Sequence, residues 1–430
     1  MTPATSVVDA QGRLKKTKKR VLTQRGVIWL GQTCNLRCYF CYFRNRVADG
    51  AHPEHPFMSL DKAKEICRTL RYVYGNTSVD LQGGEPTIYP HILELVGYCR
   101  DIGLHATLIT NGIVLAKPGT LEQFRDAGVR DFLVSLHGIG DMHDEVVGRK
   151  GAFEKIIAAI ERMRELDMPF RFNCTMTKAV VPHLTAIAQK AIEHGASVVN
   201  YIAFNDFEDQ DSGQDVRTTD NVARYSAIKP QLTEAIDMLE EAGVETNVRY
   251  LPLCMAEPRH RKNFYNLQQL SYDLHEWDFQ SWMWTGNQPQ RMRDSELMPP
   301  YLLGCRARHI YSLSQELHHD FAANKPLKRR VKFALQRGCS RFQQIIKGKD
   351  ALYRQEAIER AERDFRNQHY QACECCSLRR ICDGFHEDYA ELFGTEEAFS
   401  VSDLPVIDDP LYFIREQEKY IEKEEWPWAL

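Results

Sequence analysis

The chain has 430 residues, 43% of them hydrophobic and 27% charged, and it carries a formal net charge of −4. This ordinary globular composition argues against a disordered or repetitive protein, and the mild acidity gives no general reason to expect nucleic acid or a membrane as a partner. The thirteen cysteines follow no secretory signal segment, so they predict thiols that are free or bound to metal in a cytoplasmic protein rather than a disulfide framework. No apolar run is long enough to span a membrane.

The beginning of the chain is strongly basic. Positions 11–20 read QGRLKKTKKR and show no apolar periodicity. We interpret residues 1–24 as a basic flexible tail, which is either solvated or a contact for RNA or an acidic partner.

Beyond this tail, short β-rich runs alternate with segments of helical period. The runs predict strands at 27–30, 78–81, 106–109, 132–136, 170–175, 198–202 and 246–250. Helices are predicted at 59–73, 92–101, 121–127, 152–166, 184–194 and 223–242. Thr120 and Gln123 predict a capping box at the start of one helix, and Gly128 predicts its end.

Repeated alternation of strand and helix indicates a parallel sheet with right-handed crossovers. We therefore expect an α/β fold, with a partial (β/α)6-type TIM barrel over residues 25–250, and an open doubly wound sheet as the alternative. After residue 250 the alternation stops. A smaller, cysteine-rich α+β domain is expected over residues 251–405, with a helix near 350–368, followed by an acidic tail at 406–430. The aromatic segment 264–284 is either the core of that domain or a wall of a substrate cavity.

Three cysteines stand directly after the first predicted strand, in the segment TCNLRCYFCYF. Cys34, Cys38 and Cys41 are spaced C-x3-C-x2-C. Three thiolates can hold one face of a metal centre and leave one coordination position free, whereas a structural zinc site is closed by four ligands. A chance group of buried free cysteines and a zinc site completed by a distant ligand are the alternatives.

This loop resembles the cluster-binding loop of the radical S-adenosylmethionine (radical SAM) superfamily, with Phe40 as the aromatic residue before the third cysteine. The resemblance implies a [4Fe-4S] cluster on the three cysteines, with SAM bound at its open iron. The segment QGGEP after the second strand resembles the GGEP motif of the family. It implies that the amino end of the methionine of SAM is held by Gly83, Gly84, Glu85 and Pro86.

Three more polar residues follow later strands. By the same resemblance, Asn111, Ser135 and Asn173 contact the ribose or the carboxylate of SAM, while His137 stands where the family often has an acid. All of them fall at or just past the carboxyl ends of predicted strands, where a barrel gathers its functional loops. Each residue alone would be a turn or a satisfied polar core group, so their shared position carries the prediction.

A second cysteine cluster lies at 373–384, with the sequence CECCSLRRICDG. Its C-x2-C-x5-C spacing resembles the SPASM or twitch extension that holds auxiliary iron-sulfur clusters in part of the superfamily. The resemblance implies one auxiliary [4Fe-4S] cluster, and its ligands would be Cys373, Cys376, Cys382 and one of Cys254 or Cys305.

Other assignments of these cysteines stay open. His386 stands where the family pattern has a further cysteine, so a zinc knuckle with a Cys-Cys-Cys-His set is the main alternative. Cys375 is a bystander, a substitute ligand or a thiol near the substrate. We interpret Cys67, Cys99 and Cys174 as core residues and leave Cys339 unassigned.

The resemblance implies an enzyme that cleaves SAM reductively and abstracts hydrogen from a substrate, with an external reductant such as flavodoxin or ferredoxin. Since Cys34 comes too early for a leader-recognition domain, we expect a small-molecule substrate, a specialised metabolite, with a ribosomal peptide as the alternative. Another alternative is transfer of the 3-amino-3-carboxypropyl group of SAM to a thiophilic acceptor such as trivalent arsenic. A non-catalytic iron-sulfur electron carrier is the hypothesis of a different class, and the GGEP segment argues against it.

Overall fold

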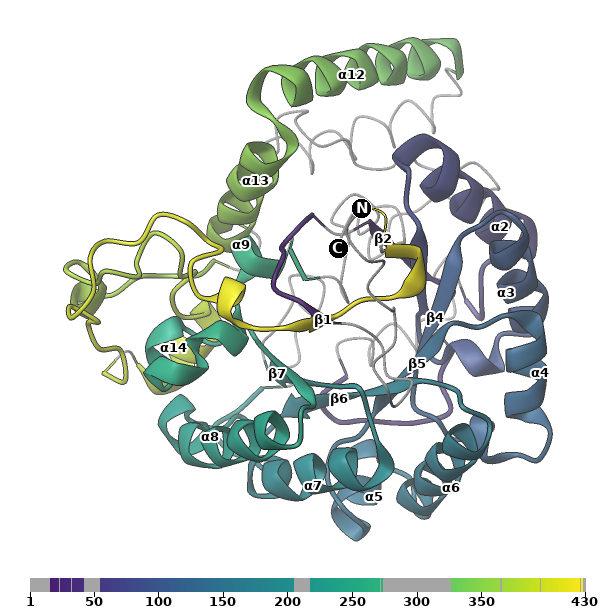
Figure 1. Ribbon diagram of the computed structural model, residues 1–430, viewed down its shortest axis with the longest axis horizontal. Helices are drawn as coiled ribbons and strands as arrows, with labels where there is room; N and C mark the ends of the chain where they lie inside the picture. Colours follow the sequence, from purple (N-terminus) through teal and green to yellow (C-terminus); the bar gives the residue numbers. More distant parts are fainter. Residues whose placement is uncertain are drawn as a thin grey trace, which may run out of the picture.

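The computed structural model describes residues 16–22, 24–31, 33–41, 55–204, 217–270, 272–273, 326–363, 366–394, 396–425 and 427 (Figure 1). Its centre is a single parallel sheet of eight strands that neighbour one another in chain order. The strands are β2 (Arg25–Trp29), β3 (Ser78–Gln82), β4 (His105–Thr110), β5 (Asp131–Ser135), β6 (Phe170–Met176), β7 (Val198–Ala203), β8 (Glu245–Arg249) and β9 (Phe264–Tyr265). All seven predicted strands are confirmed, and β9 adds one more.

Helices cover the outside of the sheet, and Figure 1 shows them as a ring around the curved strands. They are α2 (Leu60–Thr69), α3 (Ile92–Asp101), α4 (Thr120–Ala127), α5 (Asp141–Val147), α6 (Ala152–Glu165), α7 (Leu184–His194) and α8 (Tyr225–Glu241). Strands β2 and β9 are the two edges of the sheet, so the barrel is partial, as predicted.

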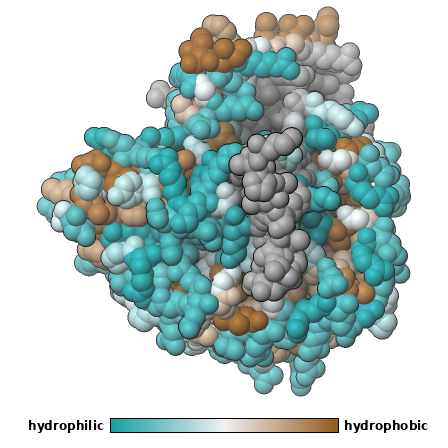
Figure 2. Space-filling model, viewed as in Figure 1, coloured by the Kyte–Doolittle hydropathy of each residue, from teal (hydrophilic) through white to brown (hydrophobic). Residues whose placement is uncertain are grey.

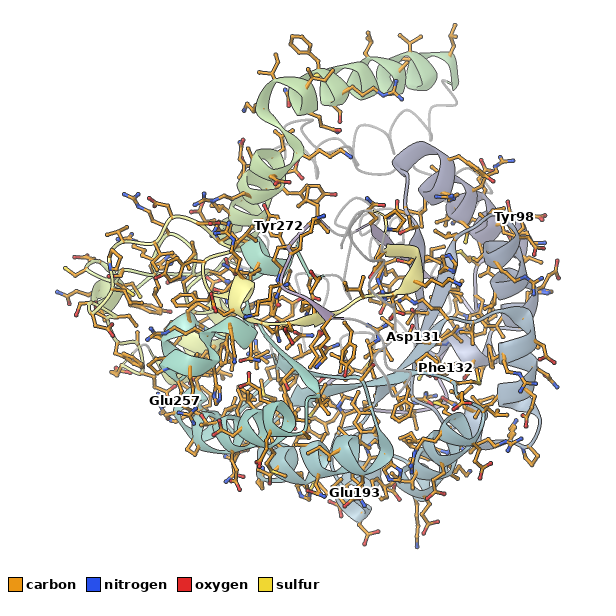
Figure 3. All side chains as sticks on the ribbon, in the orientation of Figure 1. Tyr98, Asp131, Phe132, Glu193, Glu257 and Tyr272 are labelled. Carbon is orange, nitrogen blue, oxygen red and sulfur yellow. The ribbon has the colours of Figure 1, made fainter. Side chains whose placement is uncertain are left out.

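Side chains alternate between the two faces of each strand, which is why one strand contacts both the interior and a helix. On β5, Asp131 pairs with Arg171 of the neighbouring β6, and the distance from Arg171 Nε to Asp131 Oδ2 is 2.7 Å. The next residue, Phe132, points the other way and packs edge-on against Phe124 of α4, with ring centroids 5.7 Å apart. Both labelled residues lie on this strand in Figure 3.

Two local predictions were wrong. The residue before α4 is Gly119, with φ of 79° and no side-chain cap, so Thr120 is the first helical residue and forms no capping box. The end of α4 at Gly128, with φ of 96°, is confirmed. Helix α5 was missed because its seven residues are too few to show a period, and it lies between two glycines with positive φ, Gly140 and Gly148.

The sheet continues past residue 250, where we had placed the end of the barrel. β9 pairs in parallel with β8, and the short helix α9 (Leu267–Leu270) follows it. The later helices are α12 (Pro326–Lys347), α13 (Lys349–Arg363) and α14 (Glu387–Phe393). The predicted helix near 350–368 corresponds to α13.

Both chain ends were expected to be tails, and the structure corrects this for the residues that it describes. β1 (Lys16–Thr17) pairs antiparallel with β10 (Lys419–Tyr420), and Figure 1 shows the two lying across the barrel. The physical reason is Lys419, whose side chain is fully buried and whose Nζ lies 2.7 Å from Glu245 Oε1 and 2.9 Å from Asp273 Oδ1. Residues 1–15 lie outside the described residues.

This ion-pair group marks one end of the barrel. Arg25, Asp131 and Glu245 are the first residues of β2, β5 and β8, and all three are buried in ion pairs. Charged groups therefore fill the amino-terminal end of the sheet. The polar residues predicted to bind SAM come from the opposite end of the strands.

Candidate active site

The cysteine loop follows β2 and is supported by a helix that the sequence did not reveal. The backbone amides of Arg37 and Tyr39 donate to the carbonyl oxygens of Val147 and Val146, at 3.0 and 3.4 Å. These carbonyls belong to the last turn of α5, where a helix has no internal partners for them. The loop thus satisfies the end of the helix, and the helix fixes the backbone between the cysteines.

The GGEP segment packs against the other arm of the same loop. Gly84 N donates to Gly31 O at 2.8 Å, and Glu85 N donates to Thr33 O at 2.9 Å. A Cβ atom on Gly84 would overlap the carbonyl group of Thr33, so only glycine permits this approach. The predicted SAM-binding motif and the residue before Cys34 are therefore joined directly through the backbone.

Glu85 is buried and ties together the ends of β3 and β4. Its Oε1 accepts from Thr87 N at 3.0 Å and Thr110 Oγ1 at 2.6 Å, and its Oε2 accepts from Asn111 N at 2.8 Å. Burial raises the pKa of Glu85, while these donors act in the opposite direction. Thr110 was missed by sequence reasoning, although it immediately precedes the predicted Asn111-Gly112 turn.

Asn111 links this carboxylate to the first cysteine. Its Nδ2 donates to Asn35 Oδ1 at 2.7 Å and lies 4.0 Å from Cys34 Sγ. Asn111 is therefore next to the cysteine loop, as its predicted role requires, while its backbone is held by Glu85.

The three thiols share one electrostatic environment. Burial raises the pKa of Cys34 to about 12, and the Glu85 carboxylate and Cys41 add to the effect. Burial also raises the pKa of Cys38, with further contributions from Cys41 and Cys34. Thiols in such a setting become thiolates only when a cation is among them, and iron supplies that charge.

The donor set is compatible with a cluster. Among the residues that the structure describes, no three Cys, His, Asp or Glu side chains converge as ligands of one metal ion. An iron-sulfur cluster does not need such convergence, because each thiolate binds a separate iron.

Two further predicted residues stand side by side on the inner face. Ser135 and Asn173 are direct partners in the register of β5 and β6. The Oδ1 atom of Asn173 is buried, and within the described part of the chain it has no hydrogen-bond partner. Asn173 lies in the middle of β6, beside the last residue of β5, and a buried acceptor without a partner there fits a bound ligand that carries a donor such as a hydroxyl.

His137 has a structural role that sequence reasoning did not assign. Its Nδ1 accepts from Thr175 N at 3.1 Å, and its backbone N donates to His143 Nδ1 at 3.0 Å. Burial lowers the pKa of His137 to about 3, so the ring is neutral. The ring of Phe40 packs edge-on against the ring of His137, with the ring centroids 4.6 Å apart. His137 thus positions the aromatic residue between the second and third cysteines.

Comparison with known proteins agrees with this arrangement. Residues 30–188 match the radical SAM superfamily. The chain belongs to the radical SAM superfamily. The prediction of the superfamily is therefore confirmed, and so is the prediction of an enzyme at this level.

Similarity to individual radical SAM proteins is confined to part of each chain. The AdoMet-dependent heme synthase of Methanosarcina barkeri is 35% identical over 40% of this chain and 48% of its own length. The PqqA peptide cyclase of Bradyrhizobium diazoefficiens is 31% identical over 37% of this chain and 41% of its own. The chain thus matches about half or less of these curated relatives. The crystal structure of Streptococcus suis SuiB bound to S-adenosylmethionine has a TM-score of 0.45 and 20% identity, and covers 55% of this chain and 53% of that one.

The second cysteine group also comes together, although its members are far apart in sequence. Burial raises the pKa of Cys254 to about 11, with added contributions from Cys373 and Cys376. Burial likewise raises the pKa of Cys382, and Cys254 adds to this effect. Cys305, the other candidate for the fourth ligand, lies outside the described residues.

Backbone amides are directed at two of these sulfur atoms. Leu253 N donates to Cys382 Sγ at 3.4 Å, and Val401 N donates to Cys376 Sγ at 3.5 Å. Such bonds stabilise sulfur as thiolate and are among the factors that tune iron-sulfur clusters. The four thiols therefore fit a cluster, and their role as ligands stays a prediction.

The remaining cysteines separate by exposure. Cys67 and Cys99 are buried where α2 meets α3, with their sulfur atoms 3.4 Å apart, and Cys174 is buried on β6. Their interpretation as core residues is confirmed. Cys375 and Cys339 are exposed, the latter on α12.

Proposed function

We propose that this chain cleaves SAM reductively at a [4Fe-4S] cluster bound by Cys34, Cys38 and Cys41. The observation that carries the proposal is the direct joining of the cysteine loop to the GGEP segment and to Asn111. The loop of Cys34, Cys38 and Cys41 thereby lies beside the residues that the family resemblance assigns to SAM, and burial raises the pKa of Cys34 and Cys38. When bound, the cluster supplies an electron that splits SAM into methionine and a 5'-deoxyadenosyl radical.

The residues of the chain bind, orient and enclose these groups. Gly83 and Gly84 let the GGEP segment lie directly against the backbone of residues 30–34, and Glu85 fixes the two strand ends on which Asn111 depends. Asn173 offers a buried acceptor to a hydroxyl of the ribose. Phe40, which is half-buried between the second and third cysteines, is held by the neutral His137.

We further propose one auxiliary [4Fe-4S] cluster, with Cys254, Cys373, Cys376 and Cys382 as its ligands. The proximity of Cys254 to the other three thiols supports it over the alternative with Cys305. A zinc knuckle with His386 in place of Cys254 is the alternative ligand set.

The substrate is proposed to be a small molecule that loses a hydrogen atom to the 5'-deoxyadenosyl radical. Similarity to a heme synthase supports a small-molecule substrate. A peptide is the second candidate, because another relative is a peptide cyclase. An external reductant such as flavodoxin or ferredoxin would supply the electron.

Product analysis after anaerobic reconstitution with iron and sulfide tests this function. With SAM and dithionite, the wild-type chain is expected to release 5'-deoxyadenosine. Cys38→Ala should release none, whereas Cys67→Ala is a matched control because Cys67 is buried away from the loop. Formation of 5'-methylthioadenosine would instead indicate aminocarboxypropyl transfer. If the chain carries an intact, reduced cluster and releases neither of these two products, the enzyme function is refuted.

Iron analysis tests the auxiliary cluster separately. Two clusters require about eight irons per chain and one requires about four. Cys373→Ala should lower the count to about four, keep SAM cleavage and lose modification of the substrate. A wild-type count near four would contradict the auxiliary cluster without affecting the first one.

A further inference from the structure

Helix α12 differs from every helix of the barrel in how it is attached. It has 22 residues, from Pro326 to Lys347, and α13 connects it to the rest of the chain through Gly348. α13 packs beside α9, where Ala357 and Ala361 join Leu267 and Leu270 in one apolar cluster. Figure 1 shows α12 at the periphery, beyond α13.

The apolar side chains of α12 face away from the protein. Six large apolar residues among its described side chains are strongly exposed, with exposed fractions of 75%, 52%, 70%, 63%, 82% and 65% for Leu327, Val331, Leu335, Phe342, Ile345 and Ile346. At 3.6 residues per turn these positions fall within about one third of the helix circumference. Ser340, which is only 2% exposed, lies on the opposite side. The side of α12 that carries Ser340 therefore contacts the protein, and Figure 2 shows apolar surface at this edge.

The charged residues of α12 are all of one sign. The helix contains seven Lys and Arg residues and no Asp or Glu, in a chain whose net charge is −4. Helical geometry places Arg341 along one border of the apolar face and Lys328 along the other, and both are exposed. An apolar strip between two basic borders is typical of helices that lie in the plane of a membrane surface.

We propose that α12 docks onto an anionic lipid bilayer, parallel to its plane, with Leu335, Phe342 and Ile345 inserted between the headgroups. The basic borders would then contact the negatively charged lipid headgroups. Within the ranges that the structure describes, no helix is long and apolar enough to cross a membrane.

Two other partners fit these residues less well. Nucleic acid would pair with the seven basic residues but would leave six large apolar side chains in water. A protein groove would bury the apolar strip, yet it would have to supply acidic groups along both of its borders to match the helix. The lipid surface satisfies both requirements at once over the length of the helix, which is about 33 Å.

Vesicle flotation of the intact, reconstituted chain tests the proposal. The protein should float with phosphatidylcholine vesicles that contain about 30 mol% phosphatidylserine and bind pure phosphatidylcholine at least about tenfold more weakly. Raising the salt concentration from about 0.1 M to about 0.5 M should weaken the binding, because basic residues contact the headgroups.

Paired variants test whether vesicle binding depends on the apolar face of α12 or on exposed apolar residues in general. Leu335→Asp with Ile345→Asp should reduce vesicle binding at least about tenfold, since both side chains lose their place in the bilayer. Tyr72→Asp with Val406→Asp is the matched control, because these residues are similarly exposed, at 66% and 62%, but lie elsewhere. This control should bind like the wild type.

Several results would overturn the proposal. One is the absence of wild-type binding to the anionic vesicles, and another is equal loss of binding in both paired variants. A wild-type dimer that the α12 variant abolishes, without vesicle binding, would assign the helix to self-association. Retention of RNA by the wild type, with no flotation, would assign it to nucleic acid.

Discussion

Replacement of Lys419 by methionine should destabilise the barrel although the residue is far from the site. The ammonium group is fully buried and lies 2.7 Å from Glu245 Oε1, 2.9 Å from Asp273 Oδ1 and 2.7 Å from Asn247 Oδ1. Burial alone would lower the pKa of Lys419, but the carboxylates of Asp273 and Glu245 outweigh it and hold the pKa above its usual value. The group is therefore charged in the fold.

The size of the effect follows from what Lys419→Met leaves behind. Asp273 keeps Arg249, whose Nη2 lies 2.9 Å from its Oδ2, and Glu245 keeps hydrogen bonds from Asn247 Nδ2 and the Tyr420 amide. The buried carboxylate of Glu245 thus loses its counter-ion, and removal of one partner of a buried ion pair typically costs about 3 to 5 kcal/mol of folding stability. Because Glu245 keeps two hydrogen-bond donors, we expect a loss at the lower end of this range, about 3 kcal/mol.

A double-mutant cycle with urea unfolding, followed by circular dichroism, measures this energy. Glu245→Gln combined with Lys419→Met should be less destabilised than the sum of the single variants, because the double variant restores the balance of charge. SAM cleavage should be retained in folded Lys419→Met. An unfolding free energy within about 0.5 kcal/mol of wild type, or strict additivity in the cycle, would refute the reasoning.

Two further predictions concern the active site. Gly84→Ala should abolish SAM cleavage without global unfolding, because a Cβ atom there displaces Thr33. Gly97→Ala is the control and should behave like the wild type, because its Cβ atom meets only the end of a flexible arginine. Full activity of Gly84→Ala would contradict the proposed contact. His143 has a pKa lowered to about 4 by burial, so between its ordinary 6.5 and about 4 the unfolded chain binds more protons than the folded one. Folding stability should therefore fall as the pH drops through this window, with His143 contributing about 2 kcal/mol between pH 7.5 and pH 5. His143→Asn, which keeps an acceptor for the His137 amide, should show a shallower pH dependence in urea unfolding; an unchanged slope would contradict the neutral, buried ring.

The sequence was most informative where apolar runs repeat. Seven strands and six outer helices were predicted because each buries several apolar residues at a regular spacing. β1, β9 and β10 have only two residues each, too few to show a period. The burial of Lys419 could not be foreseen either, since its acidic partners lie more than 140 residues away in the sequence.

In the active site, too, local sequence patterns could be recognised and long-range contacts could not. The spacing of Cys34, Cys38 and Cys41 is local and could be recognised directly. The choice between Cys254 and Cys305 depends on folding across more than 100 residues, and only the structure brings Cys254 to Cys373. Support of the cysteine loop by α5 likewise depends on a long-range contact that leaves no trace in the local sequence.

Electron paramagnetic resonance of the reduced, reconstituted chain tests the central claim most directly. If SAM binds at the open iron of a cluster held by three cysteines, adding SAM should change the g-values of the reduced cluster. This change should persist in Cys373→Ala and be absent in Cys34→Ala, where the cluster loses a ligand. A wild-type signal that is identical with and without SAM would contradict the account.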